Sequence, residues 1–406
     1  MFLNNYQETK NKETSLLVLI FLISFLIRTP VIFILGDTVL ENEWKTLVDN
    51  LTIYKKLSLT RFGDLFVPNL FMPPFYAFFL YFFKIFNFNN ELYIQTILFS
   101  QVFLSSLSIS IFYCINRFFF SKNISLIGAM IFSLFPLSIY APSQISSASL
   151  QSFFIITFFY FFFKTINKKN LFNICFLSIT SGLLMLLRGE FILLFLISIL
   201  YLGFFFKVNF KSIILIIFFT LVTISPYIAR NLVLFDTITI TKSIGYNLWK
   251  GNNPNSAVEG GAIANEQVDK KLSSVKKNKY YEINIDKIYL NEGIKNILND
   301  PYNYITLFFK KFFTLIFVDF NSSQKYYYHP INFLPTILLG ITSILGIIIS
   351  NKKSHKNNYL ILFFLTNIAI MSIFFILPRY KLAVIPLQII FSNYLFEYVK
   401  KYYLKK

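Results

Sequence analysis

The stretch SIILIIFFTLVTI, residues 212–224, contains no charged side chain, and neither does SLLVLIFLISFLI at residues 15–27. A helix needs roughly 20 mostly apolar residues to cross the hydrocarbon core of a bilayer. Both stretches extend to that length, and similar segments recur outward from them along the whole chain. The chain has room for about ten such spans, so the sequence predicts an all-α polytopic membrane protein.

The composition and charge support this fold class. Charged residues make up 14% of the 406 residues, whereas a soluble domain carries about 25%. The net charge is +19, but the lysines lie mostly in short linkers between apolar segments, as the positive-inside rule predicts for cytoplasmic loops. The charge therefore indicates topology and suits contact with anionic membrane lipid. Nucleic acid is not an expected partner.

Cysteine and histidine are too sparse for a disulfide framework or a metal cluster. Cys114 and Cys175 lie inside apolar segments, and His329 and His355 are far apart in the sequence. Carboxylates in the predicted external segments leave a divalent metal open, but they form no ligand motif. The sequence thus predicts no metal site and requires no cofactor.

Basic linkers, assigned to the cytoplasm, fix the order of the spans. The ten predicted spans are residues 15–35, 92–116, 124–141, 150–165, 171–187, 191–206, 212–229, 331–350, 358–377 and 382–398. There are two further apolar stretches, 70–86 and 302–318. If either of them crossed the membrane, the basic linkers that follow it would lie on the outer side and not in the cytoplasm. Both contain tyrosine and lysine, so we expect them to lie as helices in the outer interface.

Three parts follow from this topology. Residues 1–229 form an N-terminal transmembrane catalytic module, whose first external loop is 36–91. Residues 230–330 form a small external domain with an interfacial helix, and residues 331–406 carry the C-terminal transmembrane helices. We expect a multi-pass protein of the cytoplasmic (inner) membrane, with its active site facing the outside or the periplasm.

The acids that could carry chemistry fall on the predicted outer side. Asp37, Glu41 and Glu43 lie in the first external loop, where ENEWKTLVDNLTIYKK (41–56) predicts an interfacial helix. A carboxylate near a helix N-terminus is stabilised as the anion, which suits a general base; decoration of a helix end is the alternative. The middles of the spans carry almost no charge, unlike those of ion-coupled transporters.

Three arginines, Arg188, Arg230 and Arg379, lie at well-separated outer turns. A guanidinium group binds phosphate oxygens in pairs, so these arginines are candidates for an anionic substrate group. Anchoring of a span end by a snorkelling side chain is the alternative for each of them.

Six short stretches, in order along the chain, resemble the motifs of a known family. They are VPNLFMPPFYAFFLYFFKIF (67–86), LLRGE (186–190), SPYIARN (225–231), FDTITITKSIGYNLWKGNNP (235–254), INIDKIYLNEGIKNILNDPYNYITLFFKK (283–311) and PRYKLAVIP (378–386). Together they resemble bacterial family-39-type glycosyltransferases, which have the membrane GT-C fold and are similar to protein O-mannosyltransferases and lipid A aminoarabinose transferases. The resemblance implies a GT-C-like bundle with outer interfacial helices.

The resemblance also implies the substrates: a sugar donor linked to a polyprenyl phosphate, and an acceptor that is a glycan, a lipid or a protein. The first external loop of the family carries an acid followed by an aromatic residue. Glu43 with Trp44, or Glu41 with Trp44, matches this pattern here. The aspartate of the stricter pattern falls on Leu40, so Glu43, Glu41 and Asp37 all remain candidates for the catalytic base.

Further site residues follow from the same resemblance. They are Arg379, Arg230, Arg188 and Lys381 for the donor phosphate, and Trp44, Tyr380, Asn247, Asn252 and Asn253 for the substrates. One carboxylate acting on the acceptor implies inversion at the anomeric carbon. A second family acid has no counterpart, because SSASLQSFF (146–154) offers only Ala148 and Ser149.

Three other functions remain open at this stage. A transporter or flippase of lipid-linked glycans would keep polar residues around a cavity in the middle of the membrane, and the sequence shows few. A polysaccharide polymerase or ligase would share the lipid-linked substrate but not the acidic first-loop helix. An inactive relative is the third, because Ala148 stands where the family has an acid.

Overall fold

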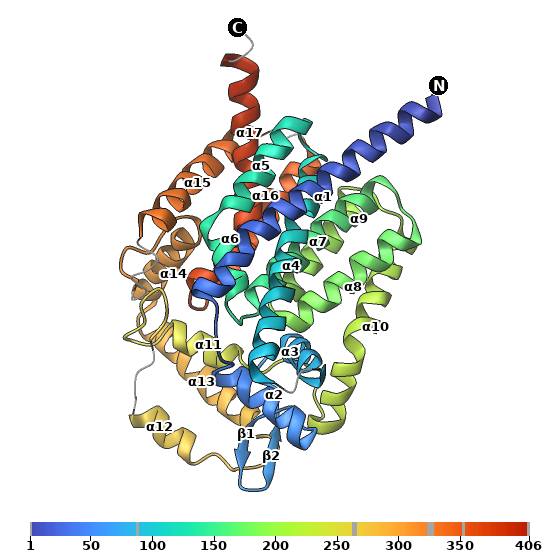
Figure 1. Cartoon of the computed structure of the whole chain (residues 1–406). Coiled ribbons are helices and arrows are strands. Elements are labelled where there is room, and N and C mark those ends of the chain that lie inside the picture. Colours follow the sequence, from blue (N-terminus) through green and yellow to red (C-terminus); the bar gives the residue numbers. More distant parts are fainter. Residues whose placement is uncertain (1, 87–88, 262–265, 323–328, 351–353, 404–406) are drawn as a thin grey trace.

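The computed structural model describes residues 2–86, 89–261, 266–322, 329–350 and 354–403. Within these ranges the chain is almost entirely helical, with one antiparallel hairpin (Figure 1). The helices form an elongated bundle, and both chain termini lie at the same end of it (Figure 1). The opposite end, here called the distal end, gathers segments that the sequence predicted to be external.

A helix occupies each of the ten predicted spans. The helices are α1 (Phe2–Leu35), α4 (Asn90–Asn116), α5 (Lys122–Leu134) with α6 (Pro136–Tyr140), α7 (Ala148–Asn167), α8 (Leu171–Leu187), α9 (Phe191–Phe204), α10 (Phe210–Phe235), α15 (Pro330–Ile349), α16 (His355–Ser372) and α17 (Ile385–Tyr403). By length and apolar composition, five described helices could cross a membrane, and α5 with α6 would make a sixth. The predicted fold class, a polytopic helical membrane protein, is confirmed.

The sixth candidate is a bent span. Helices α5 and α6 meet at Phe135–Pro136 with an angle of 61°. Proline has no N–H, so the carbonyl group of Phe132 loses the donor that a straight helix would give it. The fully buried guanidinium of Arg28 in α1 lies 3.5 Å from that carbonyl oxygen and donates to the Ser138 hydroxyl at 2.9 Å. Arg28 therefore stabilises the bend.

Aromatic side chains fill the bundle between α7, α9 and α16. The ring of Phe162 stacks on that of Tyr359 with centroids 4.1 Å apart, and Phe159 meets Phe363 edge-on at 4.8 Å. The Tyr359 hydroxyl shares a hydrogen bond of 2.7 Å with Ser198, so its polar end is satisfied inside the apolar core. Packing thus accounts for much of the phenylalanine content.

The distal end is built from short elements. They are α2 (Asn42–Tyr54), β1 (Ser58–Phe62), β2 (Leu65–Pro68), α3 (Pro74–Phe86), α11 (Ile244–Gly251), α12 (Glu266–Ser273), α13 (Tyr281–Asn299), α14 (Pro301–Ile316) and the 3-10 helix η3 (Pro378–Ala383). Helices α3 and α14 cover the two leftover apolar stretches with 13 and 16 residues. Both are shorter than the roughly 20 residues of a full crossing, as are α8 and α9, so their place in the interface stays a prediction.

The β1–β2 hairpin lies in the part of the first external loop between the two predicted helices, residues 41–56 and 70–86, for which the sequence predicted no element. Its strands pair Phe62 with Leu65 across a two-residue turn. Gly63 in that turn has a φ of +59°, a left-handed conformation that glycine adopts without steric cost. The turn therefore reverses the chain after β1.

Candidate active site

The first external loop presents two acids at the start of α2. Glu41 lies at the N-cap position and Glu43 in the first turn, and both side chains are exposed. Trp44 is half-buried behind them, with its ring 4.8 Å from that of Tyr76 in an edge-to-face contact. This contact fixes the start of α2 against α3, so Glu43 is presented from a packed helix end.

Asp37 is held by the turn that precedes α7. Its backbone N–H donates to the carbonyl oxygen of Ser143 at 3.0 Å, and its carboxylate accepts the N–H of Ile145 at 2.6 Å. Burial raises the pKa of Asp37, and the charge of Glu41 adds to the shift, although the hydrogen bond from Ile145 opposes it. Asp37 therefore joins the first loop to the turn before α7.

Glu43 faces α11. Burial raises the pKa of Tyr246 and the charge of Glu43 raises it further, so the phenol and this carboxylate are electrostatic neighbours. The ammonium nitrogen of Lys250, one turn further along α11, lies 5.9 Å from the centre of the Tyr246 ring and 4.7 Å from that of Phe375. The charge of the acid thus reaches a phenol whose helix also carries a cation.

Arg188 and Arg379 meet at Tyr380. The central carbon of the Arg188 guanidinium lies 4.8 Å from the centre of the Tyr380 ring, and that of Arg379 lies 6.0 Å away. Burial lowers the pKa of Arg188, but Glu190 and Tyr380 outweigh burial and raise it. The buried Nε atom of Arg188 has no hydrogen-bond partner among the described residues, and Arg379 is exposed. Arg379 therefore keeps exposed donors for a ligand, whereas the Nε atom of Arg188, unpaired among the described residues, is buried.

Phe375 connects these two groups. Its ring centroid lies 6.2 Å from that of Tyr380 and, as given above, near Lys250. Contacts thus run from Tyr246 through Lys250, Phe375 and Tyr380 to the two arginines, and the charge of Glu43 reaches Tyr246; we call these seven residues the distal site. The sequence predicted Glu43, Tyr380 and the arginines but missed Tyr246, Lys250 and Phe375. The signal for Lys250 was present, since it is the one cation in GYNLWKGNNP.

The guanidinium of Arg230 donates its hydrogen bonds to other groups of the protein. Helix α10 continues past the predicted boundary at residue 229 and includes Arg230 in its last turns. The guanidinium donates to the carbonyl oxygen of Asn69 at 3.0 Å and to the side-chain oxygen of Asn231 at 2.6 Å. Its geometry is that of a residue that ties the first loop to α10.

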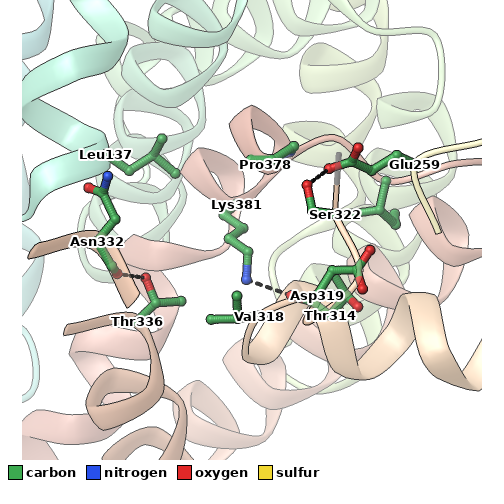
Figure 2. A pocket seen from close by; sticks show the side chains of 11 residues that line it. Leu137, Glu259, Thr314, Val318, Asp319, Ser322, Asn332, Thr336, Pro378 and Lys381 are labelled. Atoms are coloured by element: carbon green, nitrogen blue, oxygen red, sulfur yellow. Dashed lines mark hydrogen bonds between the residues drawn. The ribbon is translucent and has the colours of Figure 1, made fainter. Parts of the chain in front are cut away.

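Lys381 points into a small cavity between α14, α15 and η3 (Figure 2). Its ammonium group donates to the carbonyl oxygen of Thr314 at 2.5 Å and to that of Phe317. These carbonyls lie at the C-terminal end of α14, where a cation is favourable. The cavity has a volume of about 40 Å³, which is room for about one water molecule and not for a sugar.

Of the three predicted amide residues, Asn247 lies within α11 and the two that follow the helix serve the fold. Asn252 donates to the carbonyl oxygens of Leu248 and Ile373 at 2.8 Å each, and accepts from the buried Lys311 at 3.2 Å. Asn253 donates to Gly261 at 2.7 Å. The structure therefore gives the GNNP motif a role in shaping the end of α11. Asn247 is half-buried on the same helix.

Two carboxylates on α13, which the sequence did not single out as site residues, position the distal elements. Glu282 accepts the N–H groups of Leu70 and Phe71 at 2.6 and 2.9 Å, and Asp286 accepts the N–H of Tyr246 at 3.0 Å. Burial raises the pKa of Glu282 to about 6. Asp286 thus fixes the start of the helix that carries Tyr246 and Lys250.

An apolar groove lies between the bent pair α5–α6 and α15. It has a volume of about 620 Å³, and it is lined by Ile127, Met130, Ile131, Leu134, Phe135, Pro136, Ile331 and Pro335. The next residues along both elements, Leu137 and Thr336, line the small cavity of Lys381 (Figure 2). The groove therefore approaches η3, which carries Arg379 and Tyr380.

The acids do not form a metal site in the part of the chain that the structure describes. No group of three or more histidine, cysteine, aspartate or glutamate side chains there could hold a metal ion. Ala148 begins α7, and the buried hydroxyl of Ser149 has no hydrogen-bond partner among the described residues. The donor set of the described residues therefore does not fit a divalent metal.

Comparison with known proteins rests on structure. No protein-family model matches the sequence, and a search of curated proteins finds no match. ArnT from Cupriavidus metallidurans, bound to undecaprenyl phosphate, aligns at a TM-score of 0.42 and 8% identity over 95% of this chain and 77% of that chain. That similarity is too weak for an inference.

A stronger similarity is to an oligosaccharyltransferase from Archaeoglobus fulgidus, crystallised as a complex with zinc and sulfate. It has a TM-score of 0.53 and 14% identity, over 95% of this chain and 49% of that chain, so this chain spans about half the length of that structure. The assignment to family 39 stays a prediction. The similarity shows the fold: the chain has the GT-C architecture of polytopic membrane glycosyltransferases.

Proposed function

We propose that this protein transfers a sugar from a polyprenyl-phosphate-linked donor to an acceptor at the outer face of the cytoplasmic membrane. The observation that carries the proposal is the distal site, in which Arg188 and the exposed Arg379 meet at Tyr380 and a chain of contacts leads from there to Tyr246, which the charge of the first-loop acid Glu43 reaches. A proton acceptor near anion-binding cations is what sugar transfer from a phosphate requires. The GT-C fold agrees with this chemistry.

In the proposed reaction, an acceptor hydroxyl or amine attacks the anomeric carbon of the donor sugar. The bond between that carbon and the phosphate oxygen breaks, and the polyprenyl phosphate leaves with the bonding electrons. Glu43 takes the proton of the acceptor, and a single displacement of this kind inverts the anomeric carbon.

The cations of the distal site act on the leaving group. Negative charge grows on the phosphate as its bond to the sugar breaks, and positioned guanidinium groups stabilise such charge. We assign this role to Arg379 and Arg188, with Lys250 as a further cation. Arg230 and Lys381 are left out of this role, because their side chains already donate hydrogen bonds to backbone carbonyl oxygens.

The apolar groove between α5–α6 and α15 suits the lipid chain of the donor. It is lined only by apolar side chains and by two prolines, and it approaches η3, which carries Arg379. A prenyl chain in this groove would keep its phosphate near the end of the membrane region. This arrangement supports a lipid-linked donor over a nucleotide sugar.

The test is donor consumption by the protein in liposomes. Radiolabelled polyprenyl-phosphate sugars are supplied together with a membrane extract as the source of acceptor. We expect the wild type to consume one donor and Glu43→Gln to lose at least about 100-fold in rate, a typical loss for general acid–base catalysis. Glu266→Gln, an exposed acid on α12, is the matched control and should keep the wild-type rate.

Two outcomes would redirect the proposal. If the folded wild type consumes no donor but moves a lipid-linked glycan between leaflets, the protein is a transporter or flippase. If it joins a preassembled glycan without using a monosaccharide donor, it is a polymerase or ligase. Retained transfer by Glu43→Gln would move the role of base to Glu41 or Asp37.

A further inference from the structure

The distal end carries a basic cluster that the proposed reaction does not use. It is formed by the hairpin region, residues 54–66, and by the loop before α13, residues 274–281. These two segments contain six basic residues and one acidic residue: Lys55, Lys56, Arg61, Lys276, Lys277, Lys279 and Asp64. We call Lys56, Arg61, Lys277 and Lys279 the basic tip.

Direct contacts bring the two segments together, although they are far apart in the sequence. The ring of Phe62 lies 4.7 Å from that of Tyr281, and the ammonium nitrogen of Lys277 lies 5.3 Å from the Phe62 ring centre. Thr60 also donates to Glu282 at 3.4 Å. In Figure 1 the hairpin and α12 lie at the extreme of the distal end, opposite both termini.

Aromatic rings position the cations of the basic tip. Lys56 and Arg61 both lie over Phe66, each 4.6 Å from the ring centre, and Lys279 lies 4.8 Å from the centre of the Tyr280 ring. Cation–π contacts of this kind hold a charged group in place. A partner that binds these cations therefore has less side-chain freedom to remove.

Carboxylates leave most of this charge uncompensated. Arg61 lies 3.8 Å from Asp64, whereas no ion pair within 4.0 Å joins Lys56, Lys277 or Lys279 to a described carboxylate. By contrast, Lys271 on the neighbouring helix α12 is paired with Glu292. The basic tip thus presents a positive potential that an anionic partner would neutralise.

Membrane insertion does not explain this cluster. The positive-inside rule concerns lysine and arginine in short loops and near the ends of spans, whereas a segment as long as the predicted external domain, residues 230–330, crosses largely regardless of charge. The tip also lies beyond α3 and α14, at the far end of the molecule (Figure 1). This position favours a partner in the aqueous space over the membrane surface.

We propose that the basic tip docks an anionic acceptor glycan, one that carries carboxylate or phosphate groups along its chain. This inference rests on the proposed sugar transfer, because the acceptor is the second substrate of that reaction. Docking at the tip raises the local concentration of the glycan near the distal site, and the charged groups select it over neutral glycans.

The experiment measures binding without catalysis. The protein is placed in nanodiscs of neutral phosphatidylcholine and titrated into fluorescent polygalacturonate oligosaccharides, with dextran of equal length as the neutral probe. The variant is Lys56→Gln/Arg61→Gln/Lys277→Gln. Its matched control, Lys168→Gln/Lys169→Gln/Lys211→Gln, removes three exposed charges outside the distal end.

We expect the tip variant to weaken polygalacturonate binding about tenfold, since three exposed ion contacts are lost. The control should bind as the wild type does, and dextran should not bind. Should the tip variant unfold, the pair Lys56→Gln/Lys279→Gln keeps Arg61 and should weaken binding about threefold.

Equal losses in both triple variants, or equal binding of dextran, would overturn the inference. The inference would also be overturned if the tip variant lost binding to anionic phosphatidylglycerol vesicles but bound polygalacturonate as the wild type does. Glu43→Gln should bind like the wild type, which separates the two proposals. Tip-dependent binding without any donor consumption rejects sugar transfer, whereas donor consumption without tip-dependent binding rejects docking.

Discussion

The guanidinium of Arg188 lies over the ring of Tyr380, with its central carbon 4.8 Å from the ring centre. This contact joins the turn between α8 and α9 to η3, although the two segments are far apart in the sequence. The aromatic face and Glu190 hold the arginine charged in a largely buried position, while its Nε atom keeps a free donor among the described residues. An arginine fixed in this way is prepared for an anionic ligand.

Replacing the arginines of the distal site should therefore slow donor consumption. We expect Arg188→Gln and Arg379→Gln each to lower the rate about 100-fold, the loss typical of one electrostatic contact to a developing anion. Rates are measured in liposomes with the labelled donor, after thermal unfolding has shown that each variant folds. Arg117→Gln, at the opposite end of the bundle, is the control. Unchanged rates for both site variants would remove the arginines from the reaction.

Glu282 should make stability depend on pH. Burial raises its pKa from 4.5 to about 6, so folding favours the neutral carboxyl group. Its contribution is fully present below pH 4.5 and is lost as the pH rises through about 6, by roughly 2 kcal/mol. As the pH rises, we expect the free energy of unfolding of the wild type to fall relative to that of Glu282→Gln. The amide oxygen of this variant can still accept the backbone hydrogen bonds.

The matching variant Glu282→Ala separates hydrogen bonding from charge. It leaves the N–H groups of Leu70 and Phe71 without acceptors, which costs about 1–3 kcal/mol for each buried donor. Thermal unfolding in detergent at several pH values measures both variants against the wild type. Equal pH profiles for wild type and Glu282→Gln would show that Glu282 does not titrate between pH 4.5 and 6.

The packing of α15 on α17 depends on a glycine. A Cβ atom at Gly346 would lie 1.8 Å from the carbonyl oxygen of Phe391, and a backbone atom cannot move aside cheaply. Gly346→Ala should lower stability by about 1–3 kcal/mol, as overpacking does. In Gly203→Ala the new Cβ would meet only the end of the Ile213 side chain at 3.2 Å, so that control should stay near the wild type in thermal unfolding.

Much of the fold was predictable from the sequence, because uncharged runs of bilayer length leave few alternatives to a membrane helix. The same reasoning placed Arg188, Arg379, Arg230 and Lys381 at outer turns, where they look alike in sequence. Only tertiary contacts separate them. The donors of Arg230 and Lys381 are used by carbonyl groups of distant segments, and no local pattern reveals that.

Lys250 and Tyr246 illustrate the same limit. Within GYNLWKGNNP they resemble ordinary surface positions of a short helix. Their place in the distal site depends on Asp286, which binds the start of α11, and on Gly245, where a Cβ atom would lie 2.0 Å from the Asp286 carbonyl oxygen. The close approach of α11 to α13 thus explains one motif glycine.

Asp37 provides the sharpest test of which first-loop acid is the base. Its carboxylate accepts the N–H of Ile145, so we expect a structural role and predict that Asp37→Asn, which keeps an acceptor oxygen, retains transfer within about threefold of the wild type. Asp37→Ala should instead lower the unfolding temperature, because the N–H of Ile145 loses its partner. Since burial raises the pKa of Asp37, its stabilising contribution is greatest at low pH and declines as the pH rises. The asparagine variant should remove that decline, and a loss of transfer in Asp37→Asn as large as in Glu43→Gln would make Asp37 the base.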